Sequence, residues 1–124
     1  MSTRTTLLAS LLALCIATGC STTVLKKGAM ELTTSGRAAL QFDEEGEGQA
    51  TIRNEGPGTI LVAILDEQGG VQGRETLAPR EEKKMELVDI QRIHFENQSD
   101  QNAAVFFEVV VNGIDEIIQI DLTR

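Results

Sequence analysis

The sequence predicts an all-β protein, a small antiparallel β-sandwich of the immunoglobulin-like or jelly-roll-like kind. From residue 29 onward, apolar residues recur at every second position, which is the period of a strand with one buried face. Gly, Asn and Asp cluster between these runs and indicate turns. The pattern carries no family motif for the folded domain, so it predicts a fold class without assigning a function.

The alternating runs define the expected strands in chain order. They lie at about residues 29–34, 37–42, 49–54, 59–65, 71–77, 84–89, 91–97, 105–111 and 114–122. The continuous apolar run at 60–65 predicts a central strand, and the more polar run at 71–77 predicts an edge strand. Residues 79–92 favour a loop followed by a strand. A helix is the alternative there, because Pro79 suits a first helical position.

Asn112-Gly113 is the clearest local turn signal, because both residues tolerate the positive φ angles of a type I′ turn. Apolar runs flank this dipeptide, so the sequence predicts a terminal β-hairpin with a two-residue loop. The expected register pairs Val111 with Ile114, Phe107 with Ile118 and Val105 with Ile120 on one apolar face. That face is expected to form a major part of the core, with Phe106 on the opposite face.

The N-terminal segment differs sharply from the rest of the chain. A polar start with Arg4 precedes an apolar run at 7–17, which is shorter than the ~20 residues that a membrane-spanning helix needs. Small residues follow the run, as in a secretory signal peptide. Thr18-Gly19-Cys20 resembles the lipobox of bacterial lipoproteins, although Ala17 stands where that motif prefers Leu. The resemblance covers only this segment. It implies cleavage between Gly19 and Cys20 and lipidation of the Cys20 thiol.

The expected organisation follows from this resemblance. Residues 1–19 form the signal peptide, 20–28 the lipidated Cys and a short tether, and 29–124 the β-sandwich domain. Cys15 leaves with the signal peptide, so the mature domain has no Cys to form a disulfide. Two or more acyl chains hold a protein stably at a membrane. By resemblance to enterobacterial sorting, Ser21 permits export to the periplasmic side of an outer membrane, if there are two membranes.

Composition excludes several classes of protein. With 19 Asp+Glu against 11 Lys+Arg, the net charge of -8 disfavours nucleic acid as a partner. Aromatic residues are 3%, with no Trp or Tyr, which argues against a stacking surface for sugars or bases. Ser21, Ser35 and Ser99 lie in no nucleophile motif, so we expect no catalytic residues and no cofactor.

The strongest candidate for a binding site is a run of carboxylates. Asp43, Glu45 and Glu47, followed by Gly48, partly match the first positions of a calcium-binding loop. The match fails at position 12, where Asn54 stands in place of a bidentate Glu. A solvated hairpin turn joining 37–42 to 49–54 explains the run better, which leaves these three residues as weak metal candidates.

Two further polar features, one histidine and one tripeptide, have structural interpretations. His94, the single histidine, alternates with Ile93 and is expected to point outward from its strand. Asn97-Gln98-Ser99 has the spacing of a glycosylation sequon and is interpreted as a loop.

These observations favour a non-enzymatic, lipid-anchored bacterial envelope protein. Its β-sandwich is expected to serve as a structural or protein-interaction module, with the membrane and a further envelope protein as partners. One alternative is an envelope module that binds a small molecule or a cation. Another is a soluble secreted protein with an ordinary signal peptide.

Overall fold

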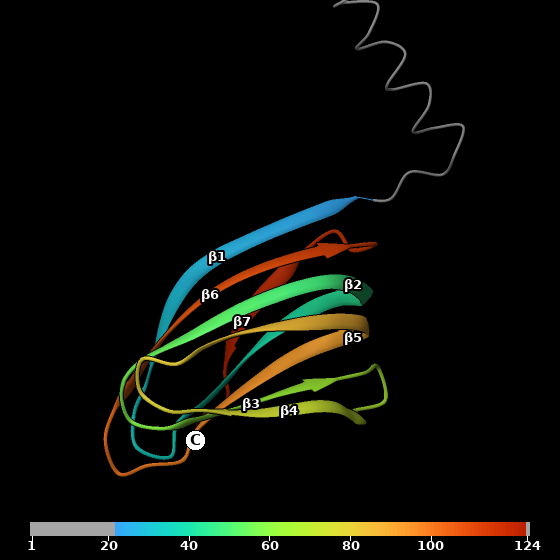
Figure 1. Cartoon of the computed structure of the whole chain (residues 1–124). Helices are drawn as coiled ribbons and strands as arrows, with labels where there is room; N and C mark the ends of the chain where they lie inside the picture. Colours follow the sequence, from blue (N-terminus) through green and yellow to red (C-terminus); the bar gives the residue numbers. More distant parts are fainter. Residues whose placement is uncertain (1–21, 124) are drawn as a thin grey trace, which may run out of the picture.

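The computed structural model describes residues 22–123, which fold almost entirely into antiparallel strands (Figure 1). The seven strands are β1 (Thr23–Leu32), β2 (Arg37–Pro57), β3 (Ile60–Leu65), β4 (Val71–Leu77), β5 (Glu82–Asn97), β6 (Ala103–Asn112) and β7 (Ile117–Asp121). Within 22–123, no helix is long and apolar enough to cross a membrane. Seven strands and no helix among residues 22–123 confirm the all-β prediction.

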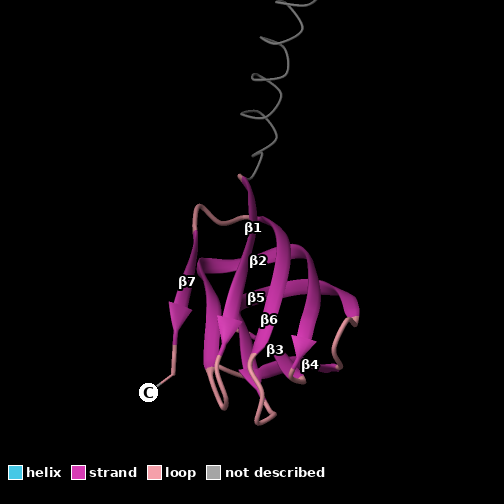
Figure 2. Cartoon of the chain, turned by 90° about the vertical axis from the view of Figure 1, so that its left-hand side faces the viewer, coloured by secondary structure: helices cyan, strands magenta, loops and turns pink. Residues whose placement is uncertain are grey.

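A single hydrogen-bonded sheet contains all of these strands, in the order β1-β6-β2-β5-β3-β4, with β7 also paired to β2. Strands β2 and β5 are long enough to take part in two layers. The first half of β2 pairs with β7 and with the second half of β5, whereas its second half pairs with β6 and with the first half of β5. The sheet therefore folds over on itself into a sandwich, which Figure 2 shows from the side.

Counting the halves of β2 and β5 separately shows which kind of sandwich this is. One layer has the order β1, β6, second half of β2, first half of β5. The other has the order first half of β2, second half of β5, β3, β4, with β7 added beside β2. Apart from the added β7, these are two four-stranded layers, and layers joined in this way form a jelly roll. Of the two architectures that the sequence predicts, the observed topology is the jelly-roll-like one.

The bend between the layers lies where the pairing of β2 with β5 shifts register, between Gln41 and Gly48. Glycine is required at two positions in this bend. A Cβ on Gly46 would collide with the side chains of Val111 and Ile114, and a Cβ on Gly48 would collide with the carbonyl oxygen of Val110. The close approach of β2 to the end of β6 therefore depends on these residues.

The core lies between the layers and is built by alternation. On β6, Val105, Phe107, Val109 and Val111 are buried, whereas Phe106 and Val110 are exposed. The opposite layer contributes its largest buried side chains from β2 and β5, namely Leu40, Phe42, Ile93 and Phe95. The predicted inner face of β6 is confirmed, as are the central position of β3 and the edge position of β4.

The predicted terminal hairpin is wrong. Strand β6 pairs with β1 on one edge and with β2 on the other, so neither edge is free to receive β7. After Gly113 the chain crosses to the other layer, where β7 pairs with β2. The crossing also reverses the predicted faces of β7: Ile117 is buried and Ile118 is exposed.

Three other boundaries differ from the prediction. Residues 37–57 form one bent strand, so the carboxylate run is a bulged segment of β2 and not a hairpin turn. Residues 82–97 form one strand, so the helix alternative for 79–92 is wrong. Strand β1 begins at Thr23, so 23–28 belong to the sandwich and not to a tether. Lys26 and Lys27 give this segment the polarity of a linker, although lysines are also common on edge strands.

Two buried asparagines hold together the loops at one end of the sandwich. The Asn97 side-chain amide donates to the carbonyl oxygens of Leu32, Thr33 and Gln101 at 2.7–3.1 Å. The Asn54 amide donates to the carbonyl oxygens of Gly58 and Leu77 at 2.7 and 2.9 Å. We call this the tied end. Because Asn97 is 1% exposed, its amide cannot accept a glycan while the domain is folded.

Candidate functional site

Strand β1 forms an open edge of the sandwich. It pairs with β6 over its whole length, from Thr23 with Asn112 to Leu32 with Ala103, with no shift in register. No described strand pairs with its other side. An unbulged edge of this length leaves backbone N–H and C=O groups free to receive another strand, and charged side chains such as Lys27 discourage indiscriminate pairing.

The surface formed by β1 and β6 on the side away from the core carries exposed apolar residues. Paired residues share a face, so Leu25 lies beside Val110, Lys27 beside Glu108 and Ala29 beside Phe106. We call these six residues the outer β1–β6 face. Leu25, Phe106 and Val110 belong to a short group of large apolar side chains that the sandwich leaves exposed.

Phe106 has a partner on the neighbouring strand. The Arg53 guanidinium carbon lies 5.1 Å from the centre of the Phe106 ring, which is within cation–π distance. Arg53 also forms ion pairs with Glu55 and Glu82. A shallow hollow of about 260 Å³ lies beside this group, lined in part by Lys27, Phe106 and Phe107.

The end of the sandwich where β1 begins is acidic. Two adjoining hollows there are lined by carboxylates from β2, from β5 and from the β3–β4 turn, and neither has a lysine or arginine among its described lining residues. We define the acidic end by eight residues that gather there: Asp43, Glu44, Glu45, Glu47, Glu67, Asp89, Asp115 and Glu116. Such a concentration of one sign of charge repels anions.

The predicted cation ligands are not brought together as a set. Oxygen atoms of Asp43, Glu44 and Asp115 lie within 4.8 Å of one another, whereas Glu45 and Glu47 are not in that group. Asp43 has a structural role, because its Oδ1 accepts from the backbone N–H groups of Asp115 and Glu116 at 3.0 and 3.2 Å. Glu45 accepts from the N–H of Glu67 at 3.2 Å. Metal binding by Asp43, Glu45 and Glu47 stays a prediction.

His94 points away from the core, as its alternation with Ile93 predicts, but it is half-buried. Its Nε2 atom is enclosed without a hydrogen-bond partner among the described residues. Burial lowers the pKa of His94, and the nearby Arg92 and Arg37 lower it further, against the opposing effect of Glu96. His94 is therefore neutral near pH 7 and has the environment of a packed side chain.

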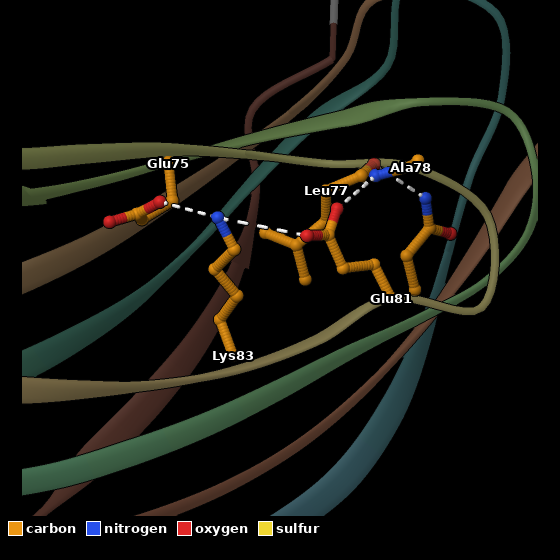
Figure 3. Close-up of polar contacts among 6 residues, drawn as sticks. Glu75, Leu77, Ala78, Glu81 and Lys83 are labelled. Atoms are coloured by element: carbon orange, nitrogen blue, oxygen red, sulfur yellow. Dashed lines mark hydrogen bonds and ion pairs between the residues drawn. The ribbon is translucent and has the colours of Figure 1, made fainter.

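The other open side of the sandwich, between β4 and β5, is bridged by an ion pair (Figure 3). Lys83 Nζ lies 2.9 Å from Glu75 Oε1 and 3.7 Å from Glu81 Oε2. The hydrogen bond to Glu75 raises the pKa of Lys83 above its usual range. Glu81 also accepts from the N–H of Ala78 at 2.9 Å, which fixes the β4–β5 turn. This bridge links β4 to β5, whereas no ion pair among residues 22–123 involves a residue of β1.

Sequence reasoning missed the outer β1–β6 face for one reason. It interpreted residues 23–28 as a tether, so Leu25 was given no structural neighbours. The available signal was the apolar character of Val24 and Leu25 beside two lysines, a pattern that also suits an edge strand.

Comparisons with known proteins give likeness in fold alone. No known family matches the sequence, and no curated protein matches it. Among solved structures, the chain is similar to a subunit of the Bacillus endospore appendages, described as a novel family of disulfide-linked pili. The TM-score is 0.53 at 12% identity, over 77% of this chain and 91% of that one. A chain of infectious bursal disease virus Gx strain matches with a TM-score of only 0.27 at 10% identity, over 83% of this chain and 40% of that one.

Proposed function

We propose that this protein is a lipid-anchored, non-enzymatic structural or protein-interaction module of a bacterial envelope. The observation that carries the interaction role is the open, unbulged edge of β1, whose free backbone groups can receive a strand from a partner. A ligand-binding module usually has a deep site with several converging polar groups. The hollow beside Phe106 has a volume of about 260 Å³, which is below the usual range of small-molecule pockets.

Two further observations support the proposal. Thr18-Gly19-Cys20 follows a short apolar run, in the manner of a lipobox. The fold is like that of a subunit from pili, which are structural assemblies outside the cell. Cys15 and Cys20 are the chain's two cysteines, and both lie outside the described residues, so lipidation remains the proposed role of Cys20.

The anchoring part of the proposal is tested on the mature N-terminus. Intact mass spectrometry of the membrane fraction should show a chain that begins at Cys20 and carries a diacylglyceryl group. Cys20→Ala should release the protein from membranes or block its processing, whereas the matched variant Cys15→Ala should be processed normally. An unmodified terminus at Ser21 or beyond would contradict lipidation and favour a soluble secreted protein. A dimer that disappears on reduction would instead assign Cys20 to a disulfide.

A cation-binding role is a second candidate, and the grouping of Asp43, Glu44 and Asp115 is the observation that favours it. Calorimetric titration of residues 21–124 with Ca²⁺ tests this role. We expect at most millimolar binding, because all three carboxylates are exposed and Asp43 already accepts backbone hydrogen bonds. Micromolar binding that is lost in Glu44→Gln would favour the cation module.

A further inference from the structure

We infer that the outer β1–β6 face lies against the lipid surface of the membrane that holds the anchor. This inference rests on the proposed lipidation of Cys20 and adds an orientation of the domain to it. The face is formed by Leu25, Lys27 and Ala29 on β1 with Phe106, Glu108 and Val110 on β6.

The position of β1 brings the domain close to the membrane. Thr22 is held at this end of the sandwich, because its carbonyl oxygen accepts from the N–H of Gly113 at 2.9 Å. Two residues extend at most about 7 Å, so a lipidated Cys20 keeps this end of the domain at the membrane surface. Leu25 lies three residues further along an extended strand, about 10 Å from Thr22.

Two surfaces compete for contact with the membrane near this anchor. One is the acidic end, where Asp43 and Asp115 gather with other carboxylates and the adjoining hollows have no described basic lining residue. Anionic headgroups repel such a surface, and its carboxylates lose hydration on contact. An end-on orientation is therefore unfavourable.

The other surface is the outer β1–β6 face. Leu25 is 58% exposed, Phe106 44% and Val110 37%. The residues between them, Lys27 and Glu108, lie opposite each other in the strand register and balance in charge. Apolar side chains beside an anchor lower the free energy of the bound state when they enter the headgroup–acyl boundary. Long basic side chains reach the headgroups from there.

The opposite layer provides a matched control at a similar height in the sandwich. Ile118 is 47% exposed on β7 and pairs with Gln41, near the same end of the domain as Val110. Its cross-strand neighbour Gln41 is polar and pairs in turn with Arg92 of β5. If the domain stood end-on, Val110 and Ile118 would lie at comparable depths. A difference in membrane contact between these two positions therefore shows which face of the sandwich lies on the membrane.

The test uses the full lipidated chain reconstituted into vesicles of phosphatidylethanolamine and phosphatidylglycerol. The protein has no Trp, so Val110→Trp, Leu25→Trp and Ile118→Trp each introduce a single indole fluorophore. In vesicles with brominated acyl chains, we expect Val110→Trp and Leu25→Trp to be quenched about twofold or more and to shift to shorter emission wavelengths. Ile118→Trp should remain unquenched.

Each other outcome overturns the inference in a distinguishable way. Equal quenching at Val110 and Ile118 indicates an end-on orientation, and no quenching in chains that float with the vesicles leaves the anchor intact while rejecting this face. If the indole of Val110→Trp is shielded from a water-soluble quencher in native membranes but not in vesicles, a protein partner covers this face. Chains that neither carry lipid by mass spectrometry nor float would reject the proposed anchoring, and this inference with it.

Discussion

The two ends of the sandwich are built differently. At the tied end, two fully buried asparagine side chains satisfy backbone groups from several loops. At the acidic end, Asp43 accepts backbone hydrogen bonds in a similar way, but it is exposed and lies among other carboxylates. The tied end therefore stabilises the fold through contacts within the domain itself. At the acidic end the carboxylates repel one another. The two hollows there have no lysine or arginine among their described lining residues to offset this repulsion.

The largest expected loss of stability comes from substitutions in the core between the two ends. Phe107→Ala should lower the free energy of unfolding by about 3–5 kcal/mol, because its side chain is buried between the layers. Phe106→Ala, on the other face of β6, should cost less than about 1.5 kcal/mol, mostly through the contact with Arg53. Chemical denaturation of both variants measures this, and equal losses would mean that the outer face is covered.

At the tied end, Asn97→Ala should cost about 3 kcal/mol. The substitution leaves the buried carbonyl oxygens of Leu32, Thr33 and Gln101 without this donor. Asn102→Ala is the matched control, because the same change at an exposed side chain should alter stability by less than about 0.5 kcal/mol. Similar midpoints for the two variants in a urea titration would show that the tied end is not held by Asn97.

At the acidic end, a substitution should act in the opposite direction. Glu44→Gln removes one charge from the group with Asp43 and Asp115 and should raise stability by about 0.3 kcal/mol at low salt. Glu31→Gln, on an exposed site of β1 toward the tied end, should change it less. Thermal melts at low and high ionic strength test this prediction. A gain at Glu44 that persists in high salt would argue against charge repulsion as the cause.

The smallest expected effect is the pH dependence of His94. Its pKa is lowered in the folded domain, so the unfolded chain binds a proton more readily between that lowered pKa and the ordinary value of about 6.5. Stability from the neutral imidazole is therefore complete above about pH 6.5 and is lost as the pH falls through this window. Denaturation from about pH 7.5 to 5.5 should show a smaller loss for His94→Gln than for the parent chain. Parallel pH profiles would contradict the prediction.

The sequence was sufficient for features that depend on local alternation. The inner and outer faces of β6 follow from apolar residues at period two, the central position of β3 from its continuous apolar run, and the edge position of β4 from its polarity. The jelly-roll-like topology was one of two expected architectures. The jelly-roll-like architecture follows only once β2 and β5 are known to span both layers, and no local sequence pattern indicates this.

The wrong turn predictions have a different cause, because they depend on how the strands pair over long range. Asn112-Gly113 has the local chemistry of a hairpin turn, but both edges of β6 are occupied by β1 and β2. Gly46 and Gly48 suggested a turn, yet their role is to admit the end of β6 against the bend in β2. The candidate surface was hidden for the same reason, since Leu25 gains its neighbours only through pairing with β6.

The full-length pairing of β1 with β6 also has a mechanical consequence. The described chain enters β1 at the acidic end, and its last residues lie at the tied end, where Thr123 Oγ1 donates to the carbonyl oxygen of Arg37. A force between these two points acts along the strands, whereas the hydrogen bonds between antiparallel strands run across them. Tension therefore loads the ten residue pairs of β1 and β6 in shear, all together, instead of peeling them apart one after another.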